Sequence, residues 1–240
     1  MVKNGISTSQ RLHEALGKII ADTQPGERLL TEPELAKQLS VSRATLREAM
    51  RTFETQGLIY RHQGSGTFVI HPSQVIDTGL EVLESIETLS RRIGLEVSMG
   101  DHQIDHRVAN EEYAKALSID PADHVLFISR VIQAEGRPVA YLIDVLPDDV
   151  ISQDELDRGF SGSMLDLLLK CGSPALASSR CEINAVQAKS DVAKALKIQR
   201  GDVLLRFIAY LYSTTGKVVD YSYSYFLPGY FNFHVIRRVG

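Results

Sequence analysis

An internal repeat limits the folds that the second half of this chain can adopt. Residues 112–147 align with residues 191–228, so that Ala114 matches Ala193 and Val139 matches Val219, with one residue inserted at a turn. Each copy reads as a short helix, a Pro- or Gly-marked turn, a strand, a hairpin turn and a second strand. Two such copies predict an α+β domain built on one mixed or antiparallel sheet, and they are too few for a solenoid.

The composition excludes several other classes of protein. Apolar residues make up 44% of the 240 and charged residues 23%, which is ordinary for a folded protein. No apolar run reaches the roughly 18 residues that a membrane span needs, and the N-terminus lacks the features of a secretory signal. The two cysteines, Cys171 and Cys181, exclude a disulfide scaffold and the common multi-cysteine zinc modules. We therefore expect a cytoplasmic protein with reduced thiols and no membrane partner.

The net charge of −4 conceals an asymmetry along the chain. Residues 1–75 carry nine Lys or Arg against seven Asp or Glu, whereas the remainder carries 17 against 23. A mildly basic head on an acidic body is compatible with a head that binds a polyanion.

Residues 1–71 show the pattern of a winged helix-turn-helix. Residues 8–22 have helical periodicity, Thr31 and Glu34 resemble a capping box at the start of a second helix, and Ser42 can cap a third helix that Gly57 ends. Residues 58–70 then read as a hairpin around a Gly-Ser-Gly tip. We place the helix-turn-helix at about 31–56 and the wing at 58–70.

The third helix carries an arginine stripe, because Arg43, Arg47 and Arg51 recur every four residues. A solvated basic face is the usual explanation of such a stripe, but a recognition helix presents its N-terminal residues to the major groove, where Arg binds guanine bidentately. Wing glycines would let backbone N–H groups approach the sugar-phosphate chain. The expected DNA contacts are Ser42, Arg43, Thr45, Arg47, His62, Gly64 and Gly66.

The motifs VSRATLREA (41–49) and GSGTFV (64–69) resemble the DNA-binding head of the GntR family of bacterial transcription regulators, over residues 8–71. The resemblance implies that arginines of the recognition helix read an operator and that the wing enters the adjacent minor groove. The family usually has LPSER before its second helix; in this chain Pro33 replaces the arginine, which often contacts DNA.

Residues 72–79 are polar and turn-rich and read as a linker, and residues 80–94 have the apolar spacing of a helix, with Leu83 and Ile93 on its apolar face. The Ser85–Gly94 motif, the repeat and the ending from Asp220 to Phe233 resemble the UTRA effector-binding domain of the HutC subfamily, over residues 80–240. This implies an α/β multidomain protein whose C-terminal α+β effector domain has a chorismate-lyase-like fold. It also implies a homodimer in which a small-molecule metabolite repositions the DNA-binding heads.

The resemblance places Ser85, Arg130, Ser163 and Asp220 at ligand-contacting positions. Arg130 lies in an apolar strand, where a guanidinium needs either an anionic ligand or an acidic side chain as partner. Asp220 shares one strand face with Ser222, which suits amine or hydroxyl recognition, although a solvated edge would show the same pattern.

Two departures from the family pattern bear on the ligand. Sugar-phosphate-sensing members often carry an Arg where Ile132 stands, and a Glu where Leu142 stands. We therefore expect a smaller or more apolar metabolite than a phosphosugar. Six of the nine tyrosines follow residue 209, which is typical of an aromatic pocket, a core or a dimer face.

The DHQIDH segment (101–106) resembles a metal cluster. On a strand, however, His102 and His106 would lie about 13 Å apart, too far for ligands that must each reach about 2.0–2.2 Å from one zinc ion. We expect neither a metal nor another cofactor.

Three functions remain open at this point. The first is a homodimeric, ligand-responsive regulator, most simply a repressor, of double-stranded operator DNA. The second is a chorismate-lyase-like enzyme fused to a DNA-binding head, although no carboxylate–histidine or nucleophile–base arrangement can be assembled from these motifs. The third is an architectural DNA binder, which would not need the large body. We expect the regulator, and no enzyme activity.

Overall fold

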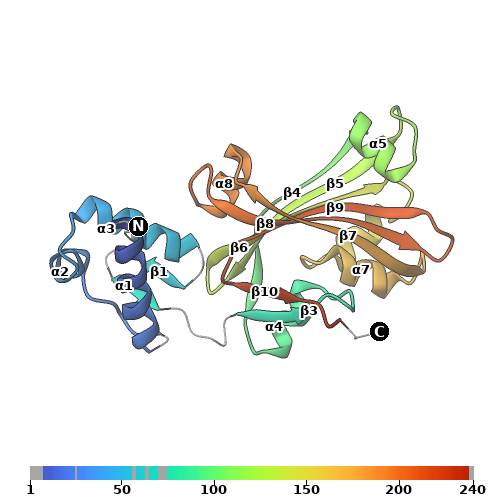
Figure 1. The fold of residues 1–240 in the computed structure, drawn as a ribbon. Coiled ribbons are helices and arrows are strands. Elements are labelled where there is room, and N and C mark those ends of the chain that lie inside the picture. Colours follow the sequence, from blue (N-terminus) through green and yellow to red (C-terminus); the bar gives the residue numbers. More distant parts are fainter. Residues whose placement is uncertain (1–7, 25, 56–57, 63–64, 70–74, 238–240) are drawn as a thin grey trace. The chain divides into compact units, whose positions relative to one another are not determined.

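The computed structural model describes residues 8–237 except 25, 56–57, 63–64 and 70–74. The chain forms two compact units (Figure 1). The first comprises Met1–Val75 with Pro228–Tyr230, and the second comprises Ile76–Leu227 with Phe231–Gly240.

The first unit contains three helices and an antiparallel hairpin, as predicted. Their bounds are α1 Thr8–Asp22, α2 Glu32–Gln38, α3 Arg43–Thr55, β1 Ile59–His62 and β2 Gly66–Val69. Thr31 and Glu34 form the expected capping box at the start of α2. Leu16, Leu46 and Met50 from α1 and α3 are fully buried together with residues of α2 and both strands. The apolar periodicity of the three helices therefore builds one core, which fixes the angle between α2 and α3.

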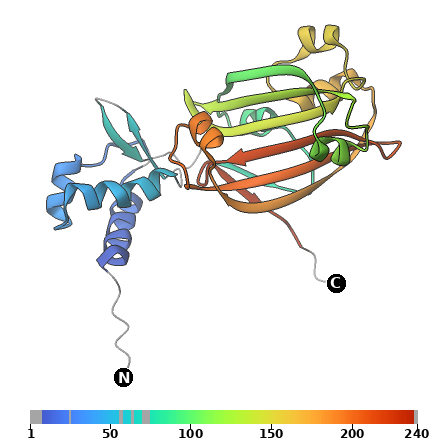
Figure 2. The ribbon, with the colours of Figure 1, turned by 90° about the horizontal axis from the view of Figure 1, so that it is seen from above.

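The second unit is built on a six-stranded antiparallel sheet in the order β4-β5-β6-β9-β8-β7 (Figure 2). The strands are β4 Val97–Val108, β5 His124–Ala134, β6 Arg137–Pro147, β7 Leu176–Gln187, β8 Val203–Ser213 and β9 Val218–Phe226. The repeat helices α5 Glu111–Leu117 and α8 Ser190–Leu196 each follow an edge strand. The two copies meet where β6 pairs with β9, so the predicted repeat and its α+β architecture are confirmed.

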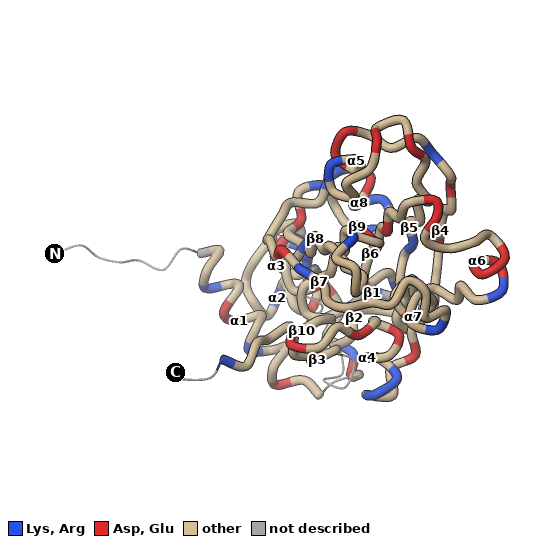
Figure 3. The backbone as a smooth tube through the Cα atoms, turned by 90° about the vertical axis from the view of Figure 1, so that its right-hand side faces the viewer, with Lys and Arg blue, Asp and Glu red and all other residues tan. Residues whose placement is uncertain are grey.

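The two faces of the sheet have different coverings. Helices α6 Gln153–Gly159 and α7 Met164–Cys171 lie on one face, where Leu126, Ile128, Leu146 and Met164 are buried. The opposite face carries α5, against which Val125, Val145 and Tyr221 pack. Figure 1 shows α5 and α7 on opposite sides of the sheet. Carboxylates gather on α5 and α6 (Figure 3), consistent with an acidic second unit.

Two expectations for residues 72–94 are wrong. The predicted linker contains the strand β3 Ile76–Gly79, which pairs in parallel with β10 Phe231–His234, a partner that no local pattern reveals. The predicted helix begins only at Ile86, as α4 Ile86–Arg92, because the Oγ of Ser85 accepts a hydrogen bond from the Thr88 N–H and so sets the helix start. Leu83, expected on the apolar face, is 50% exposed.

Candidate DNA-binding surface and effector site

The solvent-facing side of α3 presents the predicted basic residues. Leu46, Met50 and Phe53 are buried in the core, so Arg43 and Arg47 on the other side of the helix are exposed. The N–H of Thr45 donates to the Oγ of Ser42 at 3.1 Å, which caps the helix N-terminus. The predicted surface is therefore present, while the DNA contacts themselves remain a prediction.

A carboxylate that the sequence analysis missed holds this surface together. Arg47 donates to Glu32 of α2 through Nη2 at 3.0 Å and through Nε at 3.3 Å. The Nη1 of Arg61 on β1 lies 3.4 Å from the other oxygen of Glu32. The same carboxylate thus joins α2, α3 and the wing strand. These residues lie far apart in the sequence, so no periodicity indicates the contact.

The wing glycine that the structure describes is required by the fold. Gly66 has φ +120°, and a Cβ built there would lie 2.4 Å from the Nε of Arg28. The segment before α2 forms an isolated β-bridge between Arg28 and Phe68 of β2. This bridge places the guanidinium of Arg28 at the wing, as a second cation beside Arg61. Gly64 and the side chain of His62 lie outside the described residues, so their predicted roles remain predictions.

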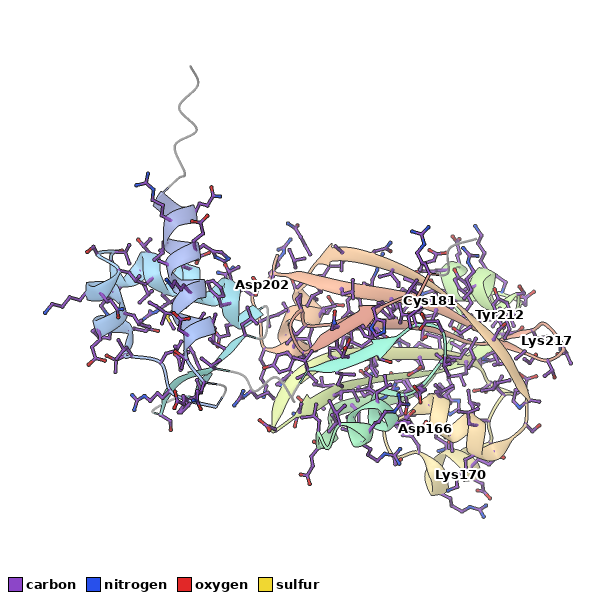
Figure 4. The ribbon with its side chains drawn as sticks, turned by 60° about the horizontal axis from the view of Figure 1, so that its bottom comes forward. Asp166, Lys170, Cys181, Asp202, Tyr212 and Lys217 are labelled. Carbon is purple, nitrogen blue, oxygen red and sulfur yellow. The ribbon has the colours of Figure 1, made fainter. Side chains whose placement is uncertain are left out.

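In the second unit, two of the predicted effector residues cap two helices. Ser85 caps α4 and Ser163 caps α7. Asp166, which is labelled in Figure 4, joins them. Its Oδ2 accepts from the Oγ of Ser85 at 2.8 Å, and its N–H donates to the Oγ of Ser163 at 3.0 Å. Nη2 of Arg91 lies 3.8 Å from the same carboxylate oxygen. The helix starts and the two serines therefore form one polar group.

Arg130 has an acidic side chain as its partner. The residue is 4% exposed, and its Nη1 donates to the Oδ2 of Asp144 on β6. Its guanidinium carbon lies 5.8 Å from the centre of the Phe160 ring. Within the described part of the chain, its Nε has no hydrogen-bond partner. The sequence left either an anionic ligand or an acidic side chain as the partner of Arg130. The structure supplies the acidic side chain, Asp144, and the Nε–H of Arg130 stays without a partner among the described residues.

Asp220 lies in the interior, not on a solvated edge. It is 6% exposed on the central strand β9, next to Asp144, and its Oδ1 has no hydrogen-bond partner among the described residues. Burial raises the pKa of this carboxyl well above its ordinary value, the Asp144 carboxylate raises it further, and Arg130 lowers it. Ser222, the next residue on this face of β9, pairs in register with Asp144 and is half-buried.

Glu87 is a second residue that sequence reasoning missed. It lies in the first turn of α4, where an acid is usually explained by the helix dipole. Its Oε1 is nevertheless buried and has no hydrogen-bond partner in the described residues. Burial raises the pKa of Glu87. The charge of Arg130 lowers this pKa, and the carboxylates of Asp166 and Asp144 raise it, so Glu87 lies near the predicted Arg130. Glu87, Arg130, Asp144 and Asp220 are called the carboxylate–arginine cluster below.

The remaining candidate groups have structural explanations. Residues 101–106 are part of strand β4, and the described residues contain no group that could hold a metal ion. His106 contacts Asp148, which raises the pKa of the imidazole. Cys171 and Cys181 are free thiols, and burial raises the pKa of Cys181, which lowers its reactivity. Several tyrosines lie on the α5 face, where the Tyr221 hydroxyl donates to Glu112 at 3.2 Å.

Comparison with known families agrees with both units. Residues 8–69 match the family of bacterial regulatory proteins called gntR, and residues 89–232 match the UTRA domain. The chain belongs to the GntR family and carries a UTRA domain. It is thus a DNA-binding transcription regulator with a C-terminal domain for a small-molecule effector. The matched families and relatives are regulators, and nothing in them supports the enzyme alternative.

Two curated relatives and one solved structure are similar to this GntR regulator over most of their length. It is 27% identical over 222 residues to the HTH-type transcriptional repressor NagR of Bacillus subtilis. This alignment covers 91% of this chain and 89% of NagR. It is 28% identical over 184 residues to the histidine utilization repressor of Pseudomonas aeruginosa, covering 75% and 71%. The crystal structure of PhnF from Mycobacterium smegmatis has the same fold, with a TM-score of 0.63, 20% identity and coverage of 95% and 100%. Among the described residues, no helix is long and apolar enough to cross a membrane.

Proposed function

We propose that this GntR regulator is a cytoplasmic homodimeric repressor that releases its operator when a metabolite binds at the carboxylate–arginine cluster. The exposed Arg43/Arg47 side of α3 carries the DNA-binding part of the proposal. The buried polar atoms of the cluster that lack partners support the effector part. The names of two relatives, both called repressors, support the direction of regulation.

We expect Arg43→Ala and Arg47→Ala to weaken operator binding by about 1–3 kcal/mol each if the side chain makes a bidentate base contact. The measurement is a titration of operator and scrambled duplex at one fixed salt concentration. Arg158→Ala, which removes an exposed arginine of the second unit, is the matched control and should change neither titration. An equal loss on both duplexes would show a phosphate contact, and unchanged operator affinity in both variants would contradict the proposed recognition surface.

The proposed homodimer rests on the resemblance to the HutC subfamily, and a two-fold protein is expected to read the two half-sites of a near-palindromic operator. The α5 face of the sheet supports it, since half-buried apolar and aromatic side chains lie there on β6, β8 and β9, beside the cluster that packs against α5. These side chains are Tyr141, Ile143, Ile208, Tyr210, Tyr223 and Tyr225.

We expect the wild-type chain to sediment at twice 26.6 kDa and Ile208→Glu to sediment as the monomer, because a carboxylate would be buried at the centre of the interface. Ile183→Glu is the matched control, since Ile183 is exposed and faces the other side of the sheet. Analytical ultracentrifugation measures all three. A monomeric wild type would refute the dimer, and a dimeric Ile208→Glu would refute this interface.

Effector binding can change operator affinity only through a difference in affinity between two states of the protein. We infer that residues 70–94 couple the two units. Within this segment Ser85 and Glu87 belong to the effector site, so a ligand that contacts them acts directly on the start of α4.

A further inference from the structure

The carboxylate–arginine cluster has more acidic groups than basic ones. Arg130, Asp144 and Asp220 are each at most 7% exposed, and Glu87 buries one of its oxygens. Arg130 and Asp144 neutralise one another as an ion pair. Among the described residues, no ion pair gives Asp220 or Glu87 a basic partner of its own. Because an uncompensated buried charge is costly, these two carboxyls need either a bound proton or a bound cation.

The atoms without partners specify what a ligand must offer. Two are acceptors, the Oδ1 of Asp220 and the Oε1 of Glu87, and one is a donor, the Nε of Arg130. These are the unsatisfied atoms of the cluster within the described residues. Buried polar groups are nearly always hydrogen-bonded in folded proteins, so three orphan atoms in one group indicate a place for a ligand. A ligand that satisfies them carries N–H donors and one acceptor oxygen.

An acidic hollow on the surface of the second unit reaches Glu87, one of the four residues of the cluster. It has a volume of about 660 Å³ and lies between α4, the start of β4 and the β5–β6 turn. Glu87 lines it, together with Glu96, Glu135 and the basic Arg91. The excess of carboxylates makes the potential negative here, which attracts cations and disfavours anions.

We propose that the effector of this regulator is a small metabolite with a protonated nitrogen, bound by Asp220 and Glu87, and an oxygen acceptor bound by the Nε of Arg130. An amino acid or a close derivative has this chemistry. The inference rests on the proposed effector site. It differs from the alternative that Arg130 binds a purely anionic ligand, because Asp144 already occupies the guanidinium, and an anion with no positive charge of its own would face three acidic side chains.

Protons take the place of the ligand cation in the free protein. Burial raises the pKa of both Asp220 and Glu87, and the neighbouring Asp144 carboxylate raises that of Asp220 further, so the free protein favours the protonated forms of these two carboxyls. The charged groups around them are Arg130, Asp144 and, beside Glu87, Asp166. A cationic ligand favours the ionised carboxylates, so its binding releases protons and its affinity rises with pH.

The experiment is a binding screen on the full chain. The probes are the 20 common amino acids, their decarboxylated amines, the matching 2-oxo acids and hexose phosphates, tested by thermal shift and then by calorimetry in two buffers of different ionisation enthalpy. Binding is expected only for compounds with a basic nitrogen, with release of protons. Asp220→Asn and Glu87→Gln should each lower the affinity of the best probe by about 30-fold or more, since a charged pair is lost. Glu111→Gln, at an exposed position of α5 on the other face of the sheet, is the matched control.

The inference is overturned if the tightest probe is an anion without a basic nitrogen, if no probe binds, or if the two variants bind as the wild type does. Operator titration with the best probe separates this inference from the proposed function. A nitrogen compound that binds at the cluster without changing operator affinity supports the recognition and contradicts the effector role. A phosphate or 2-oxo acid that releases the operator supports the effector role and overturns the recognition.

Discussion

Replacing Arg130 with alanine is expected to destabilise the second unit by about 3–5 kcal/mol. The substitution leaves Asp144 buried without its ion-pair partner, beside the equally buried Asp220. It also removes the contact with the Phe160 ring. A role limited to ligand binding would leave stability nearly unchanged, so the size of the loss tests whether Arg130 is part of the folded core.

Urea unfolding of the full chain, followed by a signal from the second unit, measures this loss. Arg91→Ala is the matched control, because Arg91 is 73% exposed and its ion pair with Asp166 is long. The double variant Arg130→Met/Asp144→Leu should recover much of the stability, since an apolar pair of similar volume removes both buried charges. A single variant within about 1 kcal/mol of the wild type would show that solvent already reaches the Arg130–Asp144 pair.

The sequence predicted those elements whose signals are local. The capping box at Thr31 and Glu34 and the hairpins of the two copies depend on residues close in the chain, and the structure contains them. The repeat added long-range information, because two equivalent β-hairpins can complete one sheet by pairing β6 with β9. The parallel pairing of β3 with β10 joins segments at opposite ends of the second unit, and neither segment has a pattern that names the other.

The candidate site was predicted in part for the same reason. The resemblance to the UTRA domain identified Arg130, Asp220, Ser85 and Ser163. It did not identify the charged side chains that lie beside Arg130 and Asp220. The partner of Arg130 was available from the sequence in principle, since Arg130 and Asp144 lie on the two strands of one predicted hairpin, and Arg130 faces Leu142 in register. The sequence could not identify Glu87 as a site residue. Its burial depends on how α4 packs, and the residues next to it in the sequence do not indicate that packing.

The second large effect concerns pH. Because burial and the neighbouring Asp144 raise the pKa of Asp220, the folded protein favours its protonated form. The resulting stability is fully present below the ordinary Asp pKa of 3.8 and is lost as the pH rises through the raised value. Each pH unit in this window costs about 1.4 kcal/mol. Asp220→Asn keeps a neutral side chain at every pH, and its amide can donate to Asp144, so the variant should be the more stable protein at pH 8.

Thermal unfolding of wild type and variant from pH 4 to pH 9 tests this. The difference in Tm should be small at pH 4 and should grow with pH, by about 2–4 °C for each kcal/mol in a domain of this size. Glu87 and His106, whose pKa values are also raised, titrate in both proteins and cancel in the difference. Asp149→Asn, at an exposed position, should give no pH-dependent difference. Parallel curves for Asp220→Asn and wild type would show that Asp220 is ionised throughout, and then no proton would be available for a cationic effector to displace.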